Sequence, residues 1–219
     1  LPKGALFHMG VSNTRRCWNM FQLPESVESA CNVGCCGIDG CVSTLVGASL
    51  VNPDRLCYVV VGDLTFFYDL NSLGNHHIGT NLRVMLVNNG RGTEFRLGIH
   101  HCNVFGDDAD KYMAAAGHFG NKSPLLVKHY AEDLGFHYLS ATTKEEFMTA
   151  LSNFTNPQLS DHSMILEVFT DSKDESEALY LMSHIQSDAK GMVRSKLKDA
   201  VRNVAGEKGI NAIKKILKK

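Results

Sequence analysis

The chain has 219 residues and a formal net charge of −1 at pH 7, and 44% of its residues are hydrophobic. This composition predicts a globular protein large enough for one α/β core or two small domains, and no apolar run approaches the roughly 20 residues that a membrane span needs. Seven cysteines in a chain of this size argue against a secreted disulfide scaffold, so we expect reduced thiols and a cytoplasmic protein.

Strands are predicted by short segments that are apolar throughout. In chain order these segments are Ala5–Met9, Leu56–Val61, Leu82–Val87, Phe136–Leu139 and Ser163–Phe169. Continuous apolar residues, unlike residues that alternate with polar ones, indicate strands covered on both faces, as in a parallel sheet.

Helices are predicted between these strands, at Cys41–Val51, Phe66–Leu73, Pro124–Leu134, Lys144–Phe154 and Asp174–Ile185. Two of them carry end signals. Ser123 is placed to cap the third helix and Gly135 to end it, while Thr143 and Glu146 have the spacing of a capping box for the fourth. The alternation of strands and helices predicts an α/β fold, a doubly wound and mostly parallel sheet with helices on both faces.

The C-terminal region differs in charge from the rest of the chain. From Ala189 onward there are ten Lys or Arg residues and two acids, with apolar residues at helical spacing. We therefore predict an α/β domain over residues 1–187 and a basic amphipathic helical tail over 188–219. Packing of this tail on its own domain or on a partner subunit is the favoured interpretation, and contact with an anionic membrane surface is the alternative.

Polar and glycine residues follow two neighbouring predicted strands. Gly62-Asp63-Leu64-Thr65 follows the second strand, and Asn88-Asn89-Gly90-Arg91-Gly92 follows the third. In doubly wound folds ligands bind at the carboxyl ends of the strands, where these turns lie. A carboxylate and an amide oxygen suit Mg²⁺, and glycine-rich turns admit a phosphate. Each turn taken alone is also compatible with ordinary turn and helix-cap chemistry.

The spacing of the two turns resembles that of thiamine-diphosphate-dependent enzymes, in which Gly-Asp is followed by Asn about two dozen residues later. Here 24 residues, 65–88, separate Gly62-Asp63-Leu64 from Asn89. The segment Gly62–Leu73, the loop Gly37-Ile38-Asp39-Gly40, and Gly10-Val11-Ser12 with the following Arg16 resemble one branch closely, the SEPHCHC synthases of menaquinone biosynthesis. The resemblance covers about residues 5–185 and corresponds to the C-terminal third of such an enzyme.

This resemblance implies the thiamine-diphosphate-binding fold, with thiamine diphosphate and Mg²⁺ as cofactors. It assigns the side chains of Asp63 and Asn89 and the backbone carbonyl of Arg91 to the magnesium ion. Ile38 is expected to support the bent cofactor from below, a catalytic role that acts by holding its two rings together. The remaining residues implied in cofactor binding are Ser12, Gly37, Gly62, Leu64, Thr65 and Gly92.

The implied activity is that of a 2-oxo acid decarboxylase or carboligase, a lyase or transferase with a 2-oxo acid donor and an acceptor. In this family a Glu on a pyrimidine-binding domain activates the cofactor, and no residue of 1–219 matches it. That domain is expected on the same gene or on a separate subunit, in a homodimer or tetramer, and the chain alone is expected to be inactive. The alternative is a catalytically incomplete assembly or binding module that keeps the fold.

A nucleotide-binding Rossmann-like domain fits the sequence less well than either of these. The first predicted strand is not followed by Gly-x-Gly-x-x-Gly, and the chain has no P-loop Gly-Lys-Ser/Thr. No nucleic-acid partner is expected.

The substrate side departs from the branch that the chain resembles. Arg16, Glu94 and Phe95 are the residues expected at the substrate, and Arg16 could bind a carboxylate through two hydrogen bonds. However, Val33 stands where that branch has a second Arg, and Glu94 stands where it has an apolar residue. A carboxylate there would repel an anionic acceptor, or hydrogen-bond hydroxyls, or pair with an amine. Both changes argue against 2-oxoglutarate and isochorismate as the substrates.

Cysteine and histidine clusters suggest two further sites, neither of them favoured. Cys31, Cys35, Cys36 and Cys41 lie close together, but they lack the Cys-x-x-Cys spacing of zinc sites. Small residues suit a crowded loop equally well. His100 or His101, downstream of the second turn, could relay protons, although adjacent histidines are more often surface residues.

Overall fold

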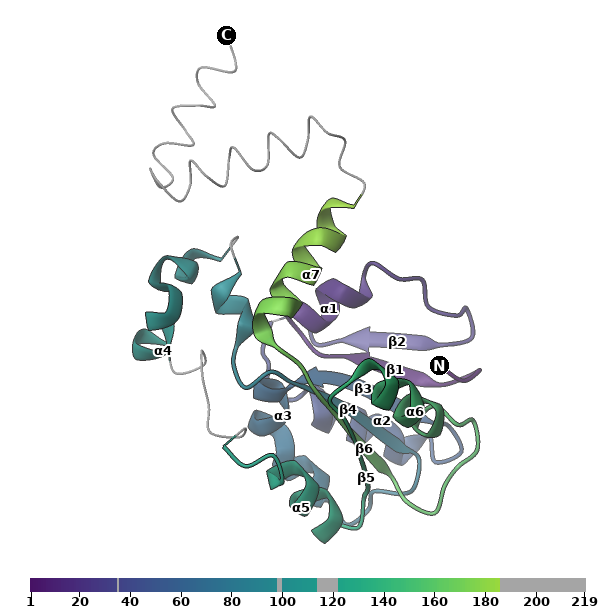
Figure 1. Cartoon of the computed structure of the whole chain (residues 1–219). Helices are drawn as coiled ribbons and strands as arrows, with labels where there is room; N and C mark the ends of the chain where they lie inside the picture. The colour runs from purple at the N-terminus through teal and green to yellow at the C-terminus, as the bar shows by residue number, and fades with distance from the viewer. Residues whose placement is uncertain (35, 98–99, 114–121, 186–219) are drawn as a thin grey trace.

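A parallel sheet forms the centre of the computed structural model, which describes residues 1–34, 36–97, 100–113 and 122–185 (Figure 1). Its six strands lie in the order β2-β1-β3-β4-β6-β5, and every neighbouring pair is parallel. The strands are β1 (Leu6–Met9), β2 (Glu28–Cys31), β3 (Cys57–Gly62), β4 (Leu82–Asn88), β5 (His137–Ala141) and β6 (Met164–Phe169).

Helices cover both faces of the sheet. Successive residues of β3 point to opposite faces and are apolar, so each face needs a covering layer. Cys57, Val59 and Val61 pack in one core cluster with α2 (Cys41–Val51), α3 (Asp63–Asp69) and α5 (Leu126–Asp133). Tyr58 and Val60 pack in a second cluster with α6 (Lys144–Phe154), and Trp18 of α1 (Asn13–Trp18) adjoins it. The predicted doubly wound α/β fold is therefore confirmed.

The predicted strands are all present, within two residues at each end, and helices α2 and α6 have the predicted bounds. At α6, Thr143 Oγ1 accepts the N–H of Glu146 at 3.2 Å, and Glu146 accepts the N–H of Thr143 at 3.3 Å, which is the predicted capping box. The predicted Ser123 cap is wrong, since α5 begins at Leu126 with Leu125 before it. Gly135 follows α5 with a positive φ of 80°, as its placement past the helix end predicts.

Other boundaries differ from the prediction. Helix α3 begins at Asp63, three residues earlier than expected, and gives way to the 3-10 helix η1 (Leu70–Gly74). Helix α7 (Ser172–His184) begins two residues early, because Asp171 Oδ1 accepts the N–H of Lys173 at 2.7 Å. The remaining short helices are η2 (Thr93–Arg96), η3 (His101–Asp108) and α4 (Ala109–Tyr112).

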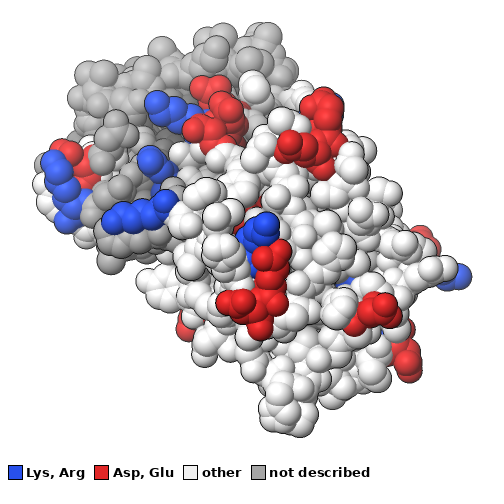
Figure 2. Space-filling model, turned by 60° about the horizontal axis from the view of Figure 1, so that its bottom comes forward, with Lys and Arg blue, Asp and Glu red and all other residues white. Residues whose placement is uncertain are grey.

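The predicted tail over 188–219 lies outside the described residues. None of the helices that the structure describes combines the length and the apolar character needed to cross a bilayer. On the face shown in Figure 2, Lys and Arg side chains gather at one end, and separate groups of Asp and Glu are scattered over a largely uncharged surface.

Candidate active site at the carboxyl ends of the strands

A cavity of about 360 Å³ opens at the carboxyl ends of β1, β3 and β4. From β1 the chain continues to β2 on one side and then crosses back to β3 on the other. The connections after β1 and β3 therefore diverge and leave a crevice between them, which is the usual ligand position in such sheets. Helix α7 closes the cavity through Glu175, Leu179 and Met182.

Most of the residues singled out from the sequence line this one cavity. Gly37 is not among the lining residues, and Arg16 reaches the cavity only through its contact with Glu94. The predicted residues that do line it are Ser12, Ile38, Gly62, Asp63, Leu64, Thr65, Asn89, Arg91, Gly92, Glu94 and Phe95.

The two expected magnesium ligands come from neighbouring strands. Asp63 begins α3 directly after β3, is only 2% exposed, and accepts the N–H of Leu64 on Oδ1 at 2.8 Å. Asn89 follows β4 in a turn that Gly90 closes with a φ of 77°, a conformation that favours glycine. The Asn89 Oδ1 atom accepts the N–H of Arg91 at 3.1 Å, and its Nδ2 donates to Glu175 at 2.7 Å.

Glu175 is a cavity residue that the sequence analysis missed. It lies in the first turn of α7, and its carboxylate accepts hydrogen bonds from Asn89 and from the Thr170 hydroxyl. Burial raises the pKa of Glu175, and the charges of Asp63 and Asp171 raise it further, although the two hydrogen bonds lower it. Its sequence signal is weak, because Glu175 follows a predicted strand but its contact with Asn89 arises only in the fold.

A third acid, Glu167, lies on β6, is 1% exposed and does not line the cavity. Asn88 Nδ2 and the Tyr138 hydroxyl each donate to it at 2.7 Å. Burial raises the pKa of Glu167, and the charge of Asp63 adds to this effect. Three acidic side chains thus lie close together, Asp63 directly after β3, Glu167 on β6 and Glu175 in α7.

Thr93 carries a buried hydroxyl without a hydrogen bond. Thr93 is 5% exposed and lines the cavity, and its Oγ1 has no hydrogen-bond partner among the described residues. Leaving a buried hydroxyl unpaired costs about 1–3 kcal/mol. A ligand oxygen within reach of Thr93 would recover this cost.

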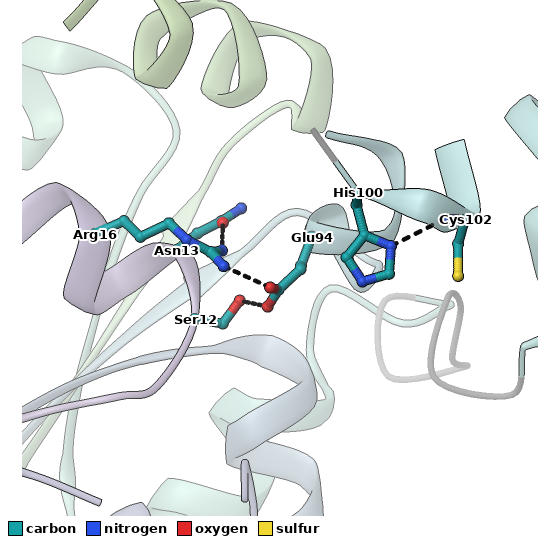
Figure 3. Close-up of polar contacts among 6 residues, drawn as sticks. All are labelled: Ser12, Asn13, Arg16, Glu94, His100 and Cys102. Carbon is teal, nitrogen blue, oxygen red and sulfur yellow. Dashed lines mark hydrogen bonds and ion pairs between the residues drawn. The ribbon is translucent and has the colours of Figure 1, made fainter. Parts of the chain in front are cut away.

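An ion pair joins Glu94, which lines the cavity, to Arg16, which does not. Arg16 of α1 donates from Nη2 to Glu94 Oε1 at 2.7 Å, and Ser12 donates from its hydroxyl to Glu94 Oε2 (Figure 3). Asn13 Oδ1 accepts from Arg16 Nη1 at 2.9 Å and holds the guanidinium in place. The two residues expected to face the substrate separately are thus joined to each other.

His100 lies near this pair, and its charge acts on Glu94 (Figure 3). However, its Nδ1 accepts the backbone N–H of Cys102 at 3.1 Å, where it caps η3. Within the described part of the chain, no group of three or more His, Cys, Asp and Glu residues is arranged to hold a metal. Cys35 of the cysteine cluster lies outside it.

Comparison with known proteins identifies relatives that share the name of the branch indicated by the motifs. No protein-family model matches the chain. The chain is 34% identical over 179 residues to 2-succinyl-5-enolpyruvyl-6-hydroxy-3-cyclohexene-1-carboxylate synthase (SEPHCHC synthase) of Bacteroides fragilis. It is 35% identical to the enzymes of that name from Phocaeicola vulgatus, over 182 residues, and Christiangramia forsetii, over 179 residues.

These matches cover 82% of the chain but only 29–31% of the relatives, so the chain spans less than a third of the length of the curated relatives it matches. The resemblance drawn from Gly62–Leu73 and Asn89 is confirmed. We conclude that the chain is a relative of the SEPHCHC synthases and corresponds to about 30% of their length.

Proposed function

We propose that this chain is the diphosphate-binding part of a thiamine-diphosphate-dependent enzyme that decarboxylates a 2-oxo acid and transfers the product to an acceptor. The observation that carries the proposal is the single cavity that gathers Asp63, Asn89 and Ile38 from three separate motifs. Similarity to the SEPHCHC synthases over 82% of the chain supports it.

The donor set suits a magnesium ion. Asp63 offers a buried carboxylate oxygen, Asn89 an amide oxygen and Arg91 a backbone carbonyl, which are the hard oxygen ligands that Mg²⁺ prefers. The charge of Asp63 contributes to the raised pKa of Glu167 and of Glu175, and a bound cation would relieve this repulsion. The Glu175 carboxylate accepts hydrogen bonds from Asn89 Nδ2 and from the Thr170 hydroxyl. It would therefore fix the orientation of the Asn89 amide and turn its oxygen toward the metal.

The rest of the cavity suits a diphosphate and an apolar ring. Gly62, Leu64, Thr65 and Gly92 would bring backbone groups close to phosphate oxygens, and the Thr93 hydroxyl would gain the partner it lacks. When bound, thiamine diphosphate supplies the electron sink for loss of carbon dioxide. Ser12 would lie beside the cofactor, and Ile38 would support it from below.

Part of the working site is proposed to lie elsewhere. A pyrimidine-binding domain would supply the activating Glu, from the remaining length that the relatives have or from a separate subunit. The working enzyme would then be a cytoplasmic homo-oligomer in which this chain alone does not turn over substrate.

Calorimetric titration of thiamine diphosphate tests the proposal. We expect binding that needs Mg²⁺, is reversed by EDTA and is lost in Asp63→Ala. Asp54→Ala is the matched control, because Asp54 is an exposed acid at the opposite end of β3. Half of the cofactor's contacts would lie on the pyrimidine-binding domain, so a negative result is followed by the same titration with that domain supplied. No binding in the second titration would reject the enzyme in favour of the assembly module.

A further inference from the structure

Two hydrogen-bond donors beside the cavity converge on one carboxylate of the chain itself. Arg16 Nη2 and the Ser12 hydroxyl each donate to a different oxygen of Glu94. A guanidinium beside a hydroxyl is also the donor set that would bind the carboxylate of a ligand. The carboxylate of Glu94 already satisfies both donors.

We propose that Glu94 is a specificity-determining residue, whose carboxylate occupies the anion-binding position of Arg16 and Ser12 and so restricts this side of the cavity to an uncharged substrate group. The inference rests on the proposed function only in taking the cavity as the substrate site.

The charge and geometry of Glu94 indicate that its carboxylate stays at the position between Arg16 and Ser12. Burial raises the pKa of Glu94, but hydrogen bonds from Arg16 and Ser12 and the charges of Arg16 and His100 outweigh it and hold the pKa below the ordinary value. The side chain therefore stays ionised at neutral pH. Asn13 Oδ1 also accepts a hydrogen bond from Arg16 Nη1, which keeps the guanidinium oriented toward Glu94. The two side chains are 34% and 29% exposed, so the pair lies at the rim, where an incoming ligand can meet it.

The surroundings disfavour an anion and suit an apolar group. The Glu94 carboxylate lines the cavity and would repel a second carboxylate on this side. Phe95 follows Glu94 and also faces the cavity, together with Leu64 and Met182. A 2-oxo monocarboxylic acid with an apolar or hydroxylated side chain meets these conditions, whereas a dicarboxylic acid does not.

Titration of succinate into the full chain, followed by NMR, tests the inference without thiamine diphosphate or magnesium. We expect Glu94→Gln to bind succinate about tenfold more tightly than the unmodified chain, since an unoccupied Arg gains a charge-assisted hydrogen bond. Adding Arg16→Ala should abolish the gain, and the neutral analogue succinamide should show none. Glu28→Gln is the matched control, because it frees Arg55 from an ion pair of 2.9 Å outside the cavity.

Two results would overturn the proposal. One is succinate binding by Glu94→Gln that does not exceed that of the unmodified chain; the other is a gain that persists without Arg16. Circular dichroism checks the fold of each variant, and Glu94→Ala replaces Glu94→Gln if the latter does not fold. Because the cofactor is absent, failure here leaves the proposed cofactor site standing, and failure of the cofactor titration leaves this result unchanged.

Discussion

Gly10 connects β1 to the cavity and offers no room for a side chain. Its N–H donates to the carbonyl of Val60 at 2.8 Å, and a Cβ at this position would lie 2.9 Å from the same carbonyl oxygen. It would also lie 3.2 Å from the Cα of Val61, so the contacts that must yield are backbone atoms of the central strand. We therefore expect Gly10→Ala to reduce the free energy of unfolding by about 1–3 kcal/mol, the usual cost of overpacking.

Gly47→Ala is the matched control and should have the opposite sign. Gly47 lies in α2, and an added Cβ would have no atom within 4 Å. Alanine in a helix interior is favoured over glycine by roughly 0.5–1 kcal/mol. Urea unfolding followed by the fluorescence of Trp18, whose ring centroid lies 4.6 Å from that of Phe7, measures both variants. Equal stability of the two alanine variants would refute the packing argument.

Two further predictions concern the acids Glu175 and Glu167. Glu175→Ala should weaken magnesium-dependent binding of thiamine diphosphate about 10–100-fold by freeing the Asn89 amide, while Asp174→Ala, its exposed neighbour, should not; equal affinities in calorimetry would contradict this. The raised pKa of Glu167 means that its ionisation destabilises the folded state. The contribution of Glu167 to the free energy of unfolding is fully present below its ordinary pKa of 4.5 and is lost as the pH rises through its raised pKa. In urea unfolding between pH 4.5 and 8, the free energy of unfolding of Glu167→Gln should therefore fall less with rising pH than that of the unmodified chain.

Local signals were sufficient where one segment carries all of the information. Helix α6 has its capping box within four residues, and β3 is apolar throughout, so both could be predicted without knowing what packs against them. Strand β2 could not, because Glu28–Cys31 is a short edge strand with mostly exposed side chains and no apolar pattern. Helix α1 could not be predicted either, because it follows Ser12, which has a positive φ of 76° that is uncommon for serine.

The candidate site divides in the same way. The turns that bear Asp63 and Asn89 could be identified because their residue types and spacing lie along the chain. Glu175 and Thr93 could not, because one depends on α7 reaching back over the end of β4 and the other on burial. The ion pair of Arg16 and Glu94 joins residues 78 positions apart, so only the folded sheet brings its two charges together.

The connection after β4 also has a consequence for how this scaffold can diversify. Asn89, the proposed metal ligand, and Glu94, the proposed selector of substrates, lie five residues apart on one short turn, and every residue from 89 to 95 except Gly90 lines the cavity. Loop grafting or recombination at this turn transfers both properties together. Drift toward a new substrate while the metal site is retained therefore needs single substitutions at positions 94 and 95, or at lining residues outside this connection, such as Met182 of α7.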